Sequence, residues 1–234
     1  MVNVVIIGAG LSGLICAKNL LQSFTNEERK IHIHILEARH RFGGRVYQES
    51  GVDMGATWSW PSHDSALLET VHDLGIRLEP QVNKGIALAH QRGGRTQQAG
   101  MDLSPSGDGS TRFENGAASI IDRLVDELKS TDHVTFALNQ KVTAITKTSD
   151  KPLSYDVTST TTSDSHTCDQ NSGNTNTASE SKSISASVVI VALPPQLASS
   201  LLFSPPLSPE KLTAMQRTPT WMADTGKVSD PLCD

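Results

Sequence analysis

The first part of the chain alternates short apolar runs with one helical pattern. Residues 2–7 form an almost continuous β-branched run, which is typical of a strand buried on both faces. Apolar positions then recur at helical spacing over residues 11–21, and residues 31–38 form a second apolar run that ends beside an acid. A strand, a helix and a strand in this order predict a βαβ unit with a parallel sheet.

Further along, the apolar pattern predicts a second set of elements. A helix is expected over residues 66–74, with Asp64 as its N-cap and Gly75 at its end. The remaining elements are expected as short strands and turns over residues 75–97, an amphipathic helix over 117–128, two strands within 134–148, and a central strand with a turn over 186–195. Between them, residues 158–183 are rich in Ser, Thr, Asp and Asn and predict a disordered hairpin insertion.

The turn between the first strand and the first helix has the spacing Gly-x-Gly-x-x-Gly. Gly8 permits a tight turn, Gly10 lets the backbone approach a pyrophosphate, and Gly13 allows close packing of helix and strand. The N–H groups at the start of the helix, where Leu11 and Ser12 lie, would face the phosphates. Because this turn stands between a strand and a helix, the pattern predicts a dinucleotide-binding site; the alternative is an ordinary glycine-rich α/β turn.

Glu37 stands at the end of the second apolar run. A carboxylate there can accept hydrogen bonds from a ribose 2′-hydroxyl and would repel a 2′-phosphate, which disfavours NADP. His32 and His34 alternate along the same run and share one face of the strand. We interpret them as partly covered strand histidines rather than as a metal pair, and expect no metal site.

The sequence that begins at Glu37, EARHRFGGRV, resembles the second fingerprint of FAD-dependent amine oxidases, whose pattern is E-A-R-x-R-x-G-G-R. The matching residues are Glu37, Ala38, Arg39, Arg41, Gly43, Gly44 and Arg45. The resemblance implies FAD as the cofactor. Arg39 and Arg45 would complement its charge, and Gly43 and Gly44 would let the loop pass close to it. A solvated basic loop is the alternative.

The resemblance continues along the chain and implies further site residues. In DMGATWSWP, the positions that would pass beside the flavin are Gly55, Ala56, Thr57 and Trp58. The position of Val142 would hydrogen-bond the adenine through its backbone. Lys227 matches a lysine that holds a water near the reactive flavin nitrogen, so it is the catalytic candidate.

The resemblance implies an α/β fold: a Rossmann-like FAD-binding domain with a partial α+β substrate domain. The expected FAD-binding domain comprises residues 1–74 and 114–204, and the incomplete substrate domain 75–113 and 205–234. The implied reaction is oxidative deamination of a small-molecule amine, with oxygen as electron acceptor and release of hydrogen peroxide. Since the family pattern normally continues well beyond this point, a truncated chain is expected. The alternatives are a non-catalytic FAD-binding fragment and an NAD-dependent dehydrogenase.

Composition narrows the remaining possibilities. The net charge of −5 argues against a nucleic-acid binder, which needs a surplus of Lys and Arg. The 3 cysteines are far apart and form no disulfide framework, which favours a reducing, cytoplasmic location. The first residues lack a basic region and are interrupted by glycines, so neither a signal peptide nor a membrane segment is expected. The sequence makes no prediction of oligomeric state.

Overall fold

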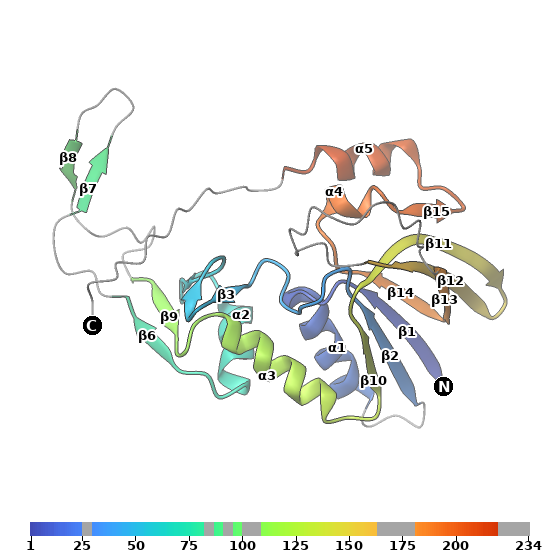
Figure 1. The fold of residues 1–234 in the computed structure, drawn as a ribbon, viewed down its shortest axis with the longest axis horizontal. Coiled ribbons are helices and arrows are strands. Elements are labelled where there is room, and N and C mark those ends of the chain that lie inside the picture. Colours follow the sequence, from blue (N-terminus) through green and yellow to red (C-terminus); the bar gives the residue numbers. More distant parts are fainter. Residues whose placement is uncertain (25–29, 82–86, 91–95, 100–108, 163–180, 220–234) are drawn as a thin grey trace, which may run out of the picture. The chain divides into compact units, whose positions relative to one another are not determined.

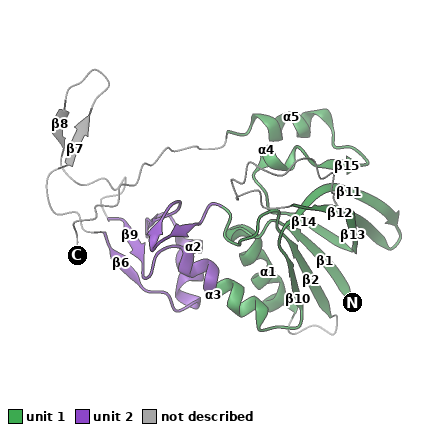
Figure 2. Ribbon diagram, viewed as in Figure 1, with its two compact units in different colours: residues 1–44, 124–234 green, residues 45–123 purple. Residues whose placement is uncertain are grey.

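A computed structural model of the chain describes residues 1–24, 30–81, 87–90, 96–99, 109–162 and 181–219. The chain divides into two compact units, one of residues 1–44 and 124–234 and one of residues 45–123 (Figure 2). These limits differ from those of the predicted FAD-binding and substrate domains. Compactness alone does not say which residues bind a cofactor, so the division into those two domains stays a prediction.

The first unit contains a four-stranded parallel sheet with the order β10-β2-β1-β14 (Figure 1). Its strands are β1 (Val2–Ile7), β2 (Ile31–Leu36), β10 (Val134–Ala137) and β14 (Val188–Val191). β1 pairs with β2 on one side and with β14 on the other, and Val5 and Ile6 within it are fully buried. The predicted parallel sheet with a doubly buried first strand is therefore confirmed.

A second sheet covers one face of the parallel sheet. Its strands are β11 (Gln140–Asp150), β12 (Leu153–Thr161), β13 (Ser181–Ala186) and β15 (Leu202–Ser204), in the order β13-β12-β11-β15. Val5 and Leu36 pack against Val142 and Val157 in a shared apolar core. Since side chains alternate along a strand, the neighbours of Val5 in β1 point to the opposite face. The helix α1 (Leu11–Phe24) contacts β1 and β2, in agreement with the predicted βαβ unit.

The predicted central strand of residues 186–195 needs correction. Within the described part of the chain, β14 pairs only with β1 and forms an edge of the sheet. Val189 and Val191 pack against the apolar core, whereas Val188 is 43% exposed. The apolar run therefore reflects burial of one face of an edge strand rather than a central position.

The ends of the predicted disordered insertion are ordered. Thr158 pairs with Ser183 and Thr160 with Ser181, so both ends of residues 158–183 extend β12 and β13. Backbone pairing needs no apolar side chain, and each strand carries its apolar residues just outside this segment, Val157 in β12 and Ile184 in β13. The prediction from composition therefore made the insertion too long at both ends. Residues 163–180 lie outside the described part of the chain.

The second unit is built from short strands. A hairpin joins β3 (Gln48–Glu49) to β4 (Val52–Asp53), and another joins β7 (Ala87–His90) to β8 (Thr96–Ala99). A three-stranded sheet has the order β5-β9-β6, with β5 (Trp58–Ser59), β9 (Thr111–Phe113) and β6 (Leu78–Pro80). The short strands and turns predicted over residues 75–97 agree with β6 and with the described part of the second hairpin.

The remaining helices are α2 (Ser65–Asp73), α3 (Ala118–Lys129), α4 (Pro195–Ala198) and α5 (Pro209–Arg217). Two of them, α2 and α3, were predicted from the sequence, and α4 and α5 were not; the capping of α2 also differs from the prediction. Gly75 follows α2 with a positive φ of 66°, as expected of a helix end. Asp64 is the N-cap residue of α2, but its side chain does not cap the helix. Its Oδ2 instead accepts a hydrogen bond from the backbone N–H of Trp60 at 2.7 Å, because the preceding turn folds back on it.

A buried carboxylate caps α3 from a distant part of the second unit. Asp53 is only 7% exposed, and its two carboxylate oxygens lie 3.1 and 3.2 Å from the backbone nitrogen of Ala117, which donates to them. Gly116 comes just before, and a Cβ there would lie 2.8 Å from Asp53 Oδ1. The carboxylate thus satisfies an N–H group that the first turn of a helix leaves without a partner.

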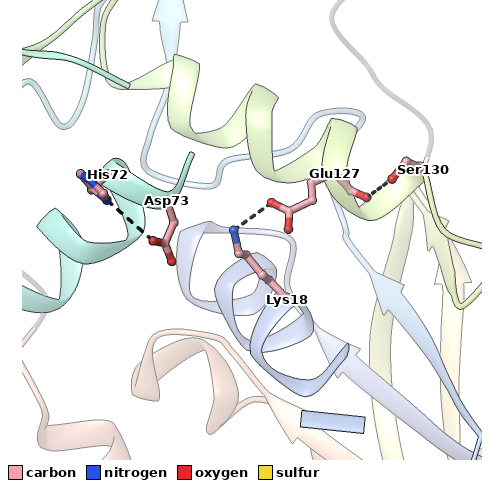
Figure 3. A network of polar contacts seen from close by, with 5 residues as sticks. All are labelled: Lys18, His72, Asp73, Glu127 and Ser130. Atoms are coloured by element: carbon pink, nitrogen blue, oxygen red, sulfur yellow. Dashed lines mark hydrogen bonds and ion pairs between the residues drawn. The ribbon is translucent and has the colours of Figure 1, made fainter. Parts of the chain in front are cut away.

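An ion pair links α1 to α3 within the first unit. The ammonium of Lys18 donates to Glu127 Oε2 at 2.9 Å (Figure 3). The side chain of Lys18 is 9% exposed and that of Glu127 is 45% exposed. Since α1 begins at the glycine turn, this pair helps to hold the helix that carries the turn.

Replacing Glu127 by Ala should lower the free energy of unfolding by about 1–3 kcal/mol, because it leaves the buried ammonium of Lys18 without its carboxylate. Urea unfolding would measure the change. The neighbouring exposed Asp126→Asn serves as a control and should stay within about 0.5 kcal/mol of the parent. If Glu127→Ala unfolded at the same urea concentration as the parent, the pair would contribute nothing to stability.

Replacing Asp53 by Ala should lower the free energy of unfolding by about 0.5–2 kcal/mol, the usual cost of losing a helix cap. Asp53→Asn should recover most of this loss, because its amide oxygen can still accept from Ala117. The exposed Glu49→Ala removes one carboxylate from the neighbouring strand and provides the matched control. Equal losses for Asp53→Ala and Asp53→Asn would show that capping is not what the carboxylate contributes.

Candidate functional site

The parallel strands of the first unit have their carboxyl ends on the same side of the sheet, and two groups of predicted site residues follow these ends. Directly after β1, the N–H of Gly8 donates to Leu36 O at 2.8 Å. After β2, the N–H of Glu37 donates to Ala137 O at 2.9 Å. The glycine turn and Glu37 are thus held side by side at the carboxyl edge, where open α/β sheets bind their ligands.

Two glycines of the turn are required by the fold itself. Gly8 has a φ of 107°, and a Cβ there would lie 2.7 Å from the carbonyl oxygen of Ala192. A Cβ on Gly13 would lie 2.1 Å from the carbonyl oxygen of Gly8, far inside contact distance. The close packing of helix and strand that the sequence predicts at Gly13 is therefore present.

Gly10 is different, because the described structure leaves room for a side chain at this position. A Cβ would meet Gly43 O at 3.9 Å and the Cα of Gly44 at 4.0 Å, which are ordinary van der Waals contacts. The φ of Gly10 is also outside the range that favours glycine. Neither packing nor backbone conformation of the described residues requires a glycine at position 10.

The carboxylate of Glu37 joins the glycine turn to the loop that follows β2. Glu37 is 9% exposed; its Oε2 accepts from the N–H of Ala9 at 2.9 Å, and its Oε1 accepts from the N–H of Arg39 at 3.0 Å. An ionised carboxylate has about four lone-pair sites, so each oxygen retains capacity for a ligand hydroxyl. The predicted ribose contact fits this arrangement, but Glu37 also has a structural role that the sequence does not reveal.

The arginine loop, residues 37–45, lies directly on the glycine turn. The N–H of Gly43 donates to Ala9 O at 2.9 Å, and Gly10 and Gly43 form a parallel bridge. Gly44 has a φ of 61°, and a Cβ there would lie 3.4 Å from the Cα of Gly10. Both glycines of the pair therefore approach the glycine turn closely, and their predicted closeness to a cofactor stays a prediction.

Arginine side chains brace the loop internally. Arg39 Nη1 and Arg41 Nη2 donate to the same carbonyl oxygen, that of Gly44, at 3.1 and 3.0 Å, and Arg41 Nη1 donates to Phe42 O at 3.1 Å. Arg41 has no site role among the sequence-based predictions. Its position in the fingerprint was the available signal, since it is matched as strictly as Arg39.

The start of β11 is hydrogen-bonded to the same loop. The N–H of Gln140 donates to Glu37 O at 2.8 Å, and the Thr162 hydroxyl donates to Ala38 O at 2.7 Å. Two residues beyond Gln140, Val142 is 5% exposed and its side chain lies in the apolar core. Its side chain is therefore not available to a ligand, and the predicted adenine contact, which is through the backbone, stays a prediction.

The other candidate residues lie in the second unit. A Cβ on Gly55 would lie 2.0 Å from the carbonyl oxygen of Arg45, so the chain passes closely over itself here. Thr57 donates from its hydroxyl to Gly55 O at 3.2 Å. Ala56 is exposed. Trp58 is 47% exposed, and its Nε1 donates to Gln81 Oε1 at 3.2 Å. Lys227 lies outside the described residues.

The histidines and Cys16 show ordinary structural environments. The His32 and His34 rings make an edge contact with centroids 4.6 Å apart, and His32 Nε2 is 2.9 Å from the Thr135 hydroxyl. Burial, and then the neighbouring His32, lower the pKa of His34, while burial raises the pKa of the Cys16 thiol. Within the described ranges, His, Cys, Asp and Glu form no group of three that could hold a metal. None of the helices in these ranges is long and apolar enough to span a membrane.

Comparison with known proteins identifies similar chains. Probable polyamine oxidase 4 of Arabidopsis thaliana is 36% identical over 81 residues, which are 32% of this chain and 15% of the relative. Putrescine oxidase of Kocuria rosea is 25% identical over 134 residues, 56% of this chain and 27% of the relative. Flavin-containing amine oxidase A of Bos taurus is 35% identical over 101 residues, 41% of this chain and 18% of the relative. The chain thus matches less than a third of each relative's length.

Solved structures share the fold. Cyclohexylamine oxidase from Brevibacterium oxydans IH-35A superposes with a TM-score of 0.68 at 17% identity, covering 92% of this chain and 63% of that one. A putrescine oxidase bound to putrescine gives 0.66 at 17% identity with the same coverage. The sequence profile described as flavin containing amine oxidoreductase matches residues 11–112 and 99–229, which together are most of the chain. The chain therefore belongs to the flavin-containing amine oxidoreductase family.

Proposed function

We propose that this chain binds FAD at the carboxyl edge of its parallel sheet and that the protein oxidises a small-molecule amine. The family is flavin-containing, which supports a flavin cofactor. The observation that carries the proposal is Gly10: the fold leaves room for a Cβ there, so the missing side chain is explained by the close approach of a cofactor phosphate.

The first helix supplies the groups that would bind the diphosphate. Its first intrahelical hydrogen bond runs from the N–H of Leu14 to Gly10 O at 3.1 Å, so the N–H groups of Leu11, Ser12 and Gly13 precede the ladder. The first turn of the helix contains no acidic residue. These N–H groups and the positive end of the helix dipole favour a bound anion.

Glu37 would bind the ribose hydroxyls through the lone pairs that Ala9 and Arg39 leave unused, and the backbone of Val142 would contact the adenine. Arg45 would balance the diphosphate charge. The segment from Gly55 to Trp58 would pass beside the flavin, with Ala38, Gly43 and Gly44 shaping the loop. We also retain the proposal that residues 1–74 and 114–204 form the FAD-binding domain, and that residues 75–113 and 205–234 belong to the substrate domain.

In the proposed reaction, bound FAD would supply the redox chemistry by accepting a hydride from the α-carbon of the amine, with oxygen as the final acceptor. The chain's own contribution is to hold and orient the cofactor and to exclude water from it. Lys227 would hold a water molecule near the reaction centre. The names of the relatives refer to putrescine, polyamines and cyclohexylamine, which supports a small amine as substrate. An intracellular location is proposed from the cysteine content alone.

Replacing Gly10 by Ala should weaken FAD binding at least about tenfold, or about 1.4 kcal/mol, while leaving the urea midpoint of the FAD-free protein unchanged. The added methyl fits the fold but occupies the space needed by the cofactor. Gly13→Ala is the matched variant with the opposite expectation: its methyl meets Gly8 O, so it should lower stability by about 1–3 kcal/mol. Quenching of flavin fluorescence and urea unfolding would measure the two effects separately.

Two results would contradict this proposal. If Gly10→Ala bound FAD as tightly as the parent, the glycine would not be there for the cofactor. If the parent chain bound NAD tightly and FAD not at all, the dinucleotide site would belong to a dehydrogenase. Amine oxidation is tested apart from binding, by hydrogen peroxide release with putrescine, a longer polyamine and cyclohexylamine. A chain that binds FAD but releases no peroxide with any amine would be a non-catalytic FAD binder.

A further inference from the structure

We propose that Arg41 is a positioning residue for the cofactor, which acts by holding the carbonyl of Gly44 and thereby the loop that lies on Gly10. Arg41 would raise FAD affinity through the conformation of this loop rather than through a contact of its own. The inference rests on the proposed FAD site and assigns different roles to the arginines of one fingerprint.

The guanidinium of Arg41 is used within its own loop. Its Nη1 donates to Phe42 O at 3.1 Å and its Nη2 donates to Gly44 O at 3.0 Å. These two carbonyls are two residues apart, with Gly43 between them, and the planar guanidinium holds both at once. A planar fork of donors with fixed geometry restricts the backbone dihedrals between these two carbonyls, which glycine residues without a Cβ would otherwise leave free.

The restricted segment is the one that touches the glycine turn. The N–H of Gly43 donates to Ala9 O at 2.9 Å, and Gly44 lies so close to Gly10 that an added Cβ would be 3.4 Å from its Cα. A change in the direction of the Gly44 carbonyl therefore changes the surroundings of Gly10. Arg41 is partly buried, whereas Arg39, which donates to the same oxygen, is exposed.

The loop has a second anchor that does not depend on Arg41. The ring of Phe42 meets that of Phe136 in β10 edge to face, with centroids 5.1 Å apart, and Lys129 Nζ lies 5.3 Å from the centroid of Phe42. Removing the guanidinium should therefore loosen Gly43 and Gly44 locally without unfolding the unit. This separates a positioning effect from general loss of stability.

The test compares Arg41→Ala and Arg41→Lys with Arg217→Ala, which removes the same charge from an exposed position in α5. Arg41→Ala should raise the Kd for FAD about tenfold. It should also speed hydrogen exchange of the Gly43 N–H in FAD-free protein, with an unchanged urea midpoint. Arg41→Lys should recover part of both effects, because it keeps one charged donor. Arg217→Ala should behave like the parent in all three measurements.

Three outcomes would overturn the inference. Unchanged FAD affinity in Arg41→Ala would remove any role for the residue. Weaker binding with unchanged exchange at Gly43 would indicate direct contact with the cofactor instead of positioning. Weaker binding with a lowered urea midpoint would indicate a general structural role. A parent chain that binds no FAD would defeat the proposed function itself, and with it the cofactor role of Arg41, so the two failures are distinguishable.

Discussion

The backbone of Ala9 joins the glycine turn to Glu37, the acid after β2, and to the arginine loop. Its N–H donates to the Glu37 carboxylate at 2.9 Å, and its carbonyl accepts from Gly43 at 2.9 Å. Ala9 is fully buried, so neither group has water as an alternative partner. Because leaving either group unpaired would be costly, the two loops keep a fixed relation before any cofactor arrives.

This arrangement depends on the layers that hold the strand ends. β1 lies between β2 and β14, the sheet β13-β12-β11-β15 covers one face, and α1 contacts β1 and β2. Burial on both sides fixes the register of β1 and β2, and register decides where their carboxyl ends stand. The same second sheet carries Val142 and is hydrogen-bonded to Glu37 through Gln140. The second sheet thus covers one face of the parallel sheet and also carries Val142, the residue predicted to contact the adenine.

Strands, helices and turns that follow from the pattern of neighbouring residues could be predicted from the sequence. Contacts between residues far apart in the chain could not. β1, the turn and α1 follow from a buried β-branched run, three spaced glycines and a helical period. The Asp53 cap on Ala117 joins residues far apart in the chain, and no period or spacing indicates it. The edge position of β14 was missed for a related reason, because an apolar run reports burial and not the number of neighbouring strands.

The three glycines of the turn are not all required for the same physical reason. In the sequence, Gly8, Gly10 and Gly13 belong to one pattern of equal weight. In the structure, Gly8 and Gly13 are required by nearby carbonyl oxygens, so they would be needed in any fold with this turn. Gly10 has room for a Cβ, so the described packing does not require a glycine there. The glycine at position 10 is therefore a sequence feature that the described packing leaves unexplained, and the proposed cofactor site would account for it.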